Sequence, residues 1–270
     1  MGILKTLSLL KERESKMRGG KSFLAVIPAR GGSKGIPNKN IKDFCGKPLI
    51  QWCIESAKKS GVFDRIIVNS DSDKILAVAA KCGVDVQPRP AELATDTALV
   101  ADVMVNSLLR LDKKYDYVQL IQATSPGVRP FQIRDAADMI LGSPPYENKN
   151  ADMVIGVHRH KDPTIVVKEL PDDLSLRNWY PKQFKDKNRQ DLPPAYRING
   201  YIYLAKWDVW VNRKDYWKTD IYAYICDEHD DIDIDNKWDW SVAEARFRAA
   251  GKYKPSKWNV CGRLLKRLAR

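Results

Sequence analysis

A short apolar run that opens into a loop of glycines and cations constrains this chain more than any other feature. Residues 23–27 read FLAVI, which is typical of a buried strand, and the run ends at Pro28. The residues that follow, ARGGSKGIPNKN, bring three cations within ten positions. Glycine lets backbone N–H groups approach an anion closely, and the cations neutralise its charge. The pattern therefore predicts a phosphate site at the end of this strand.

The loop matches neither of the two common glycine-rich nucleotide motifs. It lacks G-x-G-x-x-G, and it departs from G-x-x-x-x-G-K-[ST] because Lys34 precedes Gly35. An ordinary glycine-rich turn is the alternative, but three neighbouring cations favour a polyphosphate site. The residues expected to hold the polyphosphate, by side chain or by backbone N–H, are Arg30, Gly31, Gly32, Ser33, Lys34 and Lys39.

Strand-like and helix-like patterns alternate along most of the chain. Expected strands are 23–27, 65–69, 84–86, 117–121, 152–157, 200–204 and 222–226, and expected helices are 48–59, 73–81, 98–111, 132–140 and 240–247. We expect Asp239 to cap the last helix. Such alternation predicts an α/β fold with a doubly wound, mostly parallel sheet. Ligands of such sheets bind beyond the carboxyl ends of the strands, so the loops after Ile27, Asn69 and Ile121 are expected to form the site.

The net charge of +12 is concentrated at the two ends of the chain. Residues 1–21 hold six cations and two acids, and residues 252–270 hold seven cations and no acid. The body between these basic tails, residues 22–251, is almost neutral and is expected to be the functional domain. A neutral body with basic tails does not predict a nucleic-acid-binding face.

The lengths of the apolar runs and the spacing of the cysteines indicate the cellular compartment of the protein. No apolar run reaches the roughly 18 residues that a bilayer-spanning helix needs, so no integral membrane segment is expected. The five cysteines form no C-x-x-C pair, which is typical of reduced thiols and predicts a cytoplasmic protein without a disulfide framework or zinc site. His158 and His160 are two residues apart and are expected at a solvated strand end.

An alternating acidic stretch near the end of the body suggests a metal site. In Asp231-Ile232-Asp233-Ile234-Asp235, alternation places the three carboxylates on one face of an extended segment. Hard oxygen ligands arranged in this way suit Mg²⁺. A solvated acidic edge strand is the alternative, but the two isoleucines would anchor the segment in the core.

Two further groups of polar residues are candidates for a second, anionic substrate. Gln122, Thr124 and Ser125 follow a strand that Pro126 ends, so their side chains are expected to point into a cleft. By residue type, arginine binds carboxylate or phosphate in a bidentate manner. The candidates in the later group are Arg189, Arg197 and Asn199. No activated Ser, Cys or His nucleophile is visible, which favours direct attack by a substrate hydroxyl.

Six segments, in this order, resemble the cytidylyltransferases that activate nine-carbon 2-keto sugar acids such as sialic and legionaminic acid. They are residues 23–40, 89–97, 122–126, 189–193, 196–200 and 233–235, and the resemblance spans about residues 23–250. It implies a sheet of the nucleotide-diphospho-sugar transferase type. It also implies that CTP and a sugar acid are the substrates, with Mg²⁺ or Mn²⁺ as the cofactor.

The resemblance also assigns roles to individual residues. It implies that Asn40 and Arg89 contact the cytosine base and that Gln122 lies near the sugar carboxylate. It further implies that Asp233 and Asp235 bind the metal. The residues expected to act in catalysis are thus Arg30, Lys34, Asp233 and Asp235. Family members pair through an excursion that corresponds to residues 152–191, which implies a homodimer in which Arg189 serves the partner's site.

The identity of the sugar acid stays open. Some sialic acid enzymes carry a lysine shortly after the proline matched by Pro163, whereas this chain has Thr-Ile-Val-Val there and Lys168 only later. N-acylneuraminic and legionaminic acid are both compatible with this departure. Activation of pseudaminic acid or of the eight-carbon acid KDO is a nearer alternative. A non-catalytic nucleotide- or membrane-binding protein that works through its tails is an alternative of a different class.

Overall fold

The computed structural model describes residues 19–33, 35–147, 150–161, 169–177, 179–184, 186–212, 217–227 and 230–250. The predicted basic tails lie almost entirely outside the described residues. Lys34 and the side chain of Arg189 also lie outside them, so their predicted roles have no structural description.

A seven-stranded sheet forms the centre of the molecule, with strand order β5-β4-β1-β6-β8-β7-β9. The strands are β1 Phe23–Pro28, β4 Arg65–Ser70, β5 Asp85–Pro88, β6 Tyr117–Leu120, β7 Met153–His160, β8 Ala195–Lys206 and β9 Ile221–Cys226. All neighbouring pairs are parallel except the two that β8 makes, with β6 and with β7. The prediction of a mostly parallel α/β sheet is confirmed.

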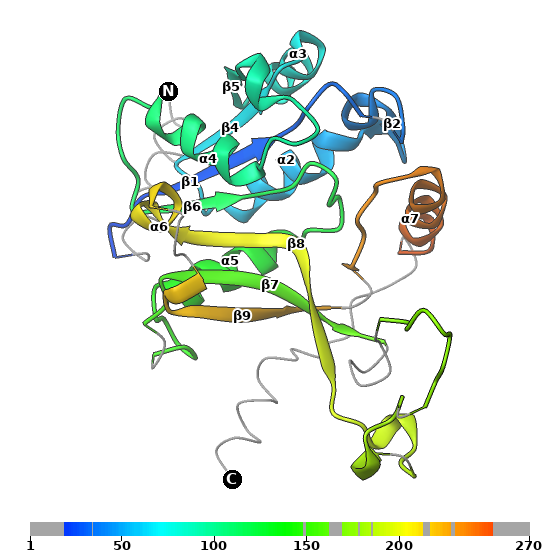
Figure 1. The fold of residues 1–270 in the computed structure, drawn as a ribbon. Coiled ribbons are helices and arrows are strands. Elements are labelled where there is room, and N and C mark those ends of the chain that lie inside the picture. The colour runs from blue at the N-terminus through cyan, green and yellow to red at the C-terminus, as the bar shows by residue number, and fades with distance from the viewer. Residues whose placement is uncertain are drawn as a thin grey trace.

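Helices cover both faces of the sheet (Figure 1). They are α2 Leu49–Ser60, α3 Asp73–Lys81, α4 Val100–Leu109, α5 Pro130–Ile140, α6 Trp207–Val211 and α7 Lys237–Ala250. Ala25 and Ile27 of β1 belong to the core beneath α2, α3 and α5, whereas Leu24 and Val26 belong to the core beneath α4 and α6. Burial on both faces explains why β1 reads as a continuous apolar run.

The first strand, β1, lies in the interior of this sheet, and later strands are added on both sides of it. From β1 the chain builds outward through β4 and β5, and it then returns to add β6 on the other side of β1. The order of the strands therefore reverses between β1 and β6, and a crevice forms at such a switch point. The loops after Ile27, Asn69 and Ile121 all lie at this edge, as predicted.

Several local features differ from the sequence-based expectations, and one of them is helix α6, which was not predicted. A short hairpin of β2 Asp43–Phe44 and β3 Lys47–Pro48 was not predicted, because it forms around a tertiary contact. Its Phe44 ring packs 5.3 Å from Trp240 and 4.9 Å from Phe247 of α7, measured between ring centroids.

The cap of α7 is also different. The side chain of Asn236 accepts the N–H groups of Trp238 and Asp239 at 2.8 and 3.0 Å. Asp239 accepts the N–H of Asn236 at 3.0 Å in return. This reciprocal capping box makes Asn236 the cap, so the prediction that Asp239 caps the helix is wrong.

The long strand β8 extends beyond its pairing with β6 and runs on beside β7. It leads from an arm, here the described residues between 169 and 194, that projects from the body (Figure 1). The predicted excursion, residues 152–191, includes β7, which instead pairs with β8 and β9 in the main sheet. Within the described residues, no helix has the length and apolar character needed to cross a membrane.

Candidate functional site

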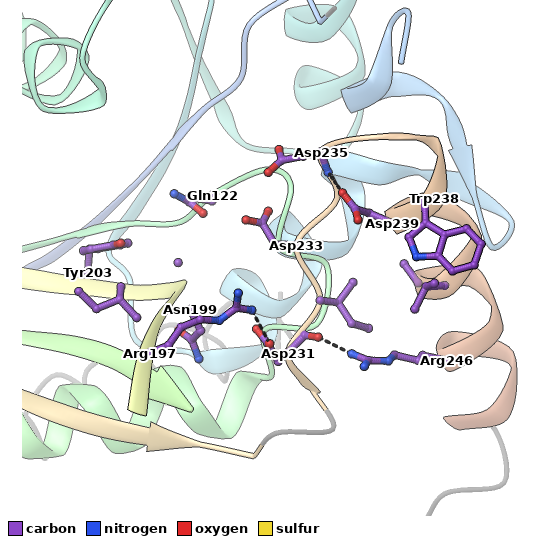
Figure 2. Close-up of a pocket in the computed structure, with 15 residues that line it drawn as sticks. Gln122, Arg197, Asn199, Tyr203, Asp231, Asp233, Asp235, Trp238, Asp239 and Arg246 are labelled. Atoms are coloured by element: carbon purple, nitrogen blue, oxygen red, sulfur yellow. Dashed lines mark hydrogen bonds and ion pairs between the residues drawn. The ribbon is translucent and has the colours of Figure 1, made fainter. Parts of the chain in front are cut away.

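Two cavities meet at the edge of the sheet where β1, β4 and β6 end. The first, here the loop cavity, has a volume of about 310 Å³, and its lining includes Arg30, Ser33, Lys39, Asn40, Arg89 and Thr124. The second, here the carboxylate cavity, has a volume of about 500 Å³, and its lining includes Arg197, Asn199, Tyr203, Asp231, Asp233 and Arg246 (Figure 2). Gln122 and Asp235 line both cavities, so these two residues mark the junction.

Polar groups of the glycine-rich loop have protein partners. The N–H of Gly31 donates to the Asp71 carboxylate at 3.0 Å, and the N–H of Ser33 donates to the Gly31 carbonyl at 3.1 Å. The Arg30 guanidinium lies 2.6 Å from the Asp96 carboxylate. A bound polyphosphate would have to replace these partners, and the predicted phosphate contacts of Arg30, Gly31, Gly32 and Ser33 stay predictions.

Asn40 and Arg89 shape the deeper part of the loop cavity. Asn40 is buried, and its amide N–H donates to the Arg30 carbonyl at 3.0 Å, whereas its own carbonyl oxygen Oδ1 has no hydrogen-bond partner among the described residues. A buried acceptor without a donor is unusual and suits an amino group of a ligand. Arg89 donates to the side-chain oxygen of Asn69 at 2.7 Å and to its backbone oxygen at 2.9 Å, and burial lowers the pKa of the Arg89 guanidinium.

The acidic segment follows the predicted alternation. Ile232 and Ile234 are buried, whereas Asp233 and Asp235 are exposed to the cavity and point toward Gln122 (Figure 2). The pKa of Asp233 is raised, first because surrounding protein displaces water and second because the Asp235 carboxylate carries the same charge. A cation would relieve this repulsion, so the pair fits a divalent metal ion.

Asp233 and Asp235 would offer a metal ion only two protein side chains as ligands. Among the described residues, no group of three or more His, Cys, Asp or Glu side chains could hold a metal ion. Mg²⁺ is commonly held by one or two carboxylates together with water and substrate phosphates. Asp233 and Asp235 match that type of site, in which the protein supplies only part of the coordination.

Lys39 links the glycine-rich loop to the acidic segment. It is buried, its ammonium donates to the Ile234 carbonyl at 2.6 Å, and it lies 3.4 Å from the Asp235 carboxylate. A Cβ atom at Gly35 would collide with the Asp235 backbone carbonyl, so the loop can approach the segment this closely only with glycine there. Lys39 thus contacts the segment as well as lining the loop cavity.

Asp231 has a different environment from the other two carboxylates. One of its oxygens lies 2.9 Å from Arg197 Nη2 and 2.9 Å from His158 Nε2. Figure 2 also shows Arg246 donating to the Asp231 backbone carbonyl, at 2.6 Å. His158 is buried, so the expectation of a solvated strand end is wrong for this residue. Asp231 therefore holds the Arg197 guanidinium at the wall of the carboxylate cavity.

An irregular stretch of β8 presents Asn199 to the carboxylate cavity. The β7–β8 register shifts between Ile155 and Val157, and Gly200 adopts a φ of +74°. A Cβ atom at Gly200 would collide with the Gln122 side chain. Such bulges re-aim side chains next to active sites. This one brings Asn199 and Gln122 to the same wall.

Ser125 is the predicted substrate residue that the structure places away from these groups. It is completely buried and lines neither cavity. Its neighbour Thr124 lines the loop cavity, hydrogen-bonds Asp233 through its side chain, and accepts the Ile234 N–H at 3.2 Å.

Comparison with known proteins gives a consistent result. The sequence profile of the cytidylyltransferase family matches residues 24–236. The chain is 33% identical over 222 residues to the N-acylneuraminate cytidylyltransferase of Escherichia coli O18:K1:H7, a match that covers 82% of this chain and 51% of that protein. It therefore spans about half the length of that relative.

Two relatives of similar size also match. Post-translational flagellin modification protein B of Campylobacter coli is 30% identical over 228 residues, covering 82% of this chain and 93% of that protein. The pseudaminic acid cytidylyltransferase of Campylobacter jejuni is 29% identical over 229 residues, covering 83% of this chain and 96% of that protein.

Solved structures share the fold. A CMP:2-keto-3-deoxy-manno-octonic acid synthetase in complex with CTP matches with a TM-score of 0.63 at 17% identity, over 86% of this chain and 100% of that one. A Mycobacterium tuberculosis protein in complex with manganese matches with a TM-score of 0.52 at 13% identity, over 83% and 98%.

Proposed function

The chain belongs to the cytidylyltransferase family, and we propose that it transfers CMP from CTP to the anomeric hydroxyl of a nine-carbon 2-keto sugar acid. The family resemblance seen in the sequence is thereby confirmed. The observation that best supports the proposed reaction is the junction of the two cavities. Because Gln122 and Asp235 line both, a nucleotide in the loop cavity and an acid in the carboxylate cavity would meet beside them.

In this proposal the loop cavity receives CTP. The cytosine amino group donates to the buried Oδ1 of Asn40, to which no described residue donates. Arg30 leaves Asp96 to contact the triphosphate, together with Lys34 and the loop backbone. This exchange replaces a half-exposed ion pair, which contributes little to stability, so its loss on binding costs little.

We assign a divalent cation to Asp233 and Asp235, with Mg²⁺ expected and Mn²⁺ as the alternative. The raised pKa of Asp233 supports a site where two carboxylates share one counter-charge. The manganese complex of the structural neighbour is in keeping with a divalent ion in this fold. When bound, the ion would neutralise charge on the phosphate oxygens of CTP.

The carboxylate cavity receives the sugar acid. Arg197, held by Asp231, and Gln122 bind the sugar carboxylate, and Asn199 donates to a neighbouring oxygen. The anomeric oxygen of the sugar attacks the α-phosphorus and releases its proton to solvent. The bond between the α-phosphorus and the bridging oxygen breaks, and pyrophosphate leaves with that oxygen. Alignment of the two substrates supplies much of the rate enhancement.

The acid is N-acylneuraminic or legionaminic acid in the reading that we favour. The alternative is pseudaminic acid, which the Campylobacter jejuni relative is named for, or KDO, the acid named in the CTP complex. The test is pyrophosphate release from CTP with each acid in turn. Release with a nine-carbon acid supports the proposal, and no release with any nine-carbon acid refutes it. If KDO releases no pyrophosphate either, a binding protein is favoured.

We also propose that the chain is a homodimer that pairs through its arm. The arm and the adjoining end of β8 expose the apolar side chains of Leu170, Leu174, Leu176, Tyr180, Tyr196 and Ile198. Exposed apolar side chains scattered singly are ordinary on a protein surface, whereas several of them gathered in one part of the chain favour an interaction site. Analytical ultracentrifugation should show a dimer that Leu176→Asp weakens and that Leu109→Asp, at an exposed position of α4, leaves intact. A monomeric wild-type chain would contradict this proposal.

A further inference from the structure

Among the described residues, the segment that carries Asp233 and Asp235 pairs with no strand of either sheet. Residues 231–235 have no regular secondary structure, although Ile232 and Ile234 are buried. Buried backbone N–H and C=O groups must still find partners. The partners that hold this segment therefore determine where its carboxylates lie.

Tyr201 of β8 supplies several of these partners with one hydroxyl group. The hydroxyl donates to the Asp230 carbonyl oxygen. It accepts the N–H of Ile232 at 2.5 Å, and the Ile232 carbonyl oxygen lies 3.2 Å away. One phenol on a rigid strand thus fixes the backbone immediately before the two proposed metal ligands.

The surroundings of this hydroxyl are fitted to it. Tyr201 is completely buried, and its own N–H donates to the side-chain oxygen of Asn199 at 3.1 Å. A Cβ atom at Gly127 would collide with both the Tyr201 hydroxyl and the Asp230 carbonyl, so only glycine leaves room for their contact. Burial raises the pKa of Tyr201 well above its ordinary value, and the phenol keeps its proton.

We propose that Tyr201 is a positioning residue for the metal site: its hydroxyl fixes residues 230–232 and thereby sets where Asp233 and Asp235 present their carboxylates. This inference rests on the proposed function, because it takes these two residues to be the metal ligands. Side chains that orient metal ligands typically change metal affinity by 10- to 100-fold when they are removed. Tyr201 would act in this way through the backbone of the segment.

The experiment measures Mn²⁺ affinity in the presence of CTP, by electron paramagnetic resonance of the free ion, with no acceptor present. Tyr201→Phe keeps the ring and removes the hydroxyl, and it should weaken Mn²⁺ binding by about 10-fold or more. Gly127→Ala disturbs the same contact from the other side and should weaken binding in the same direction. Thermal unfolding of each variant reports whether it folds.

Tyr224→Phe is the matched control. Tyr224 is also buried, and its hydroxyl donates to the Asp135 carboxylate at 3.0 Å, away from the acidic segment. It should lose stability but keep the wild-type Mn²⁺ affinity. Unchanged affinity in folded Tyr201→Phe, or equal losses in Tyr201→Phe and Tyr224→Phe, would overturn the positioning role alone. A wild-type protein that binds no Mn²⁺ would overturn the proposed metal site as well.

Discussion

The ammonium of Lys39 lies 2.6 Å from the carbonyl oxygen of Ile234, although 195 residues separate the two in the chain. This hydrogen bond joins the glycine-rich loop, which lines the loop cavity, to the segment that carries Asp233 and Asp235. The two halves of the proposed site are thus connected directly. A change at Lys39 should therefore affect both of them.

We expect Lys39→Met to weaken divalent metal binding and to raise the KM for CTP. The variant leaves the buried Ile234 carbonyl without its Lys39 donor, which costs about 1–3 kcal/mol. This cost either lowers the unfolding free energy or is avoided when the acidic segment moves. Mn²⁺ titration and steady-state kinetics measure the two effects. Lys42→Met is the control, because Lys42 instead lies 4.8 Å from the centre of the Trp240 ring. A rise in the KM for CTP with unchanged Mn²⁺ affinity would contradict the link.

Substitutions of the three carboxylates of the acidic segment should have different effects on the kinetics. Asp233→Asn or Asp235→Asn should lower turnover by on the order of 10³-fold or more, because each removes a ligand of the metal that stabilises the transition state. Asp231→Asn should chiefly raise the KM for the sugar acid, because Asp231 holds Arg197 at 2.9 Å. Circular dichroism checks that the variants fold. Full activity in Asp235→Asn would exclude it as a metal ligand.

Much of the fold and part of the candidate site could be predicted from the sequence, because local residue patterns determine them. The run from Phe23 to Ile27 had to be a strand buried on both faces, and alternation in 231–235 had to turn its isoleucines inward. The expected order of strands and helices along the body followed from the same periodicities.

The remaining features depend on contacts between distant residues. Tyr201 lies in an apolar strand and is indistinguishable in sequence from a core tyrosine, and its contacts are 29 and 31 residues further along the chain. The burial of His158 was not predicted for the same reason, because its contact with Asp231 joins residues that are far apart in the sequence. The Asn199-Gly200 pair was the one local signal that the backbone of β8 is irregular there.

Arg30→Ala should raise the KM for CTP and also lower kcat. In the proposed reaction, Arg30 contacts charge that moves as pyrophosphate leaves, so its contribution grows in the transition state. Arg65→Ala is a matched control, because Arg65 pairs with Asp85 at 2.6 Å on the far end of β4. Kinetic parameters identical to wild type in Arg30→Ala would place the triphosphate elsewhere.

Glu55 should make stability depend on pH. Lys47 at 2.8 Å and then Lys59 at 3.1 Å hold its pKa at about 2, below the ordinary value of 4.5. A depressed carboxylate pKa stabilises the fold above the unfolded-state pKa, and this contribution is lost as the pH falls from about 5 toward 2.

We therefore expect Glu55→Gln to lower the unfolding free energy at pH 7 by about 1 kcal/mol, since partial exposure screens the interaction. In urea titrations, the difference from wild type should shrink steadily below pH 5. Glu244→Gln, which breaks a 3.5 Å pair with exposed Arg248, should change stability by only about 0.3 kcal/mol. A difference for Glu55→Gln that is constant with pH would refute this interpretation.

The most direct test of the proposed reaction follows each phosphate of CTP in the presence of Mg²⁺ and a nine-carbon 2-keto sugar acid. With the label on the α-phosphate, it should appear in a CMP-sugar; with the label on the γ-phosphate, it should appear in pyrophosphate. The sugar nucleotide and pyrophosphate should form in equal amounts. Transfer of the γ-label to the sugar, or release of free CMP without a sugar nucleotide, would contradict the proposed reaction.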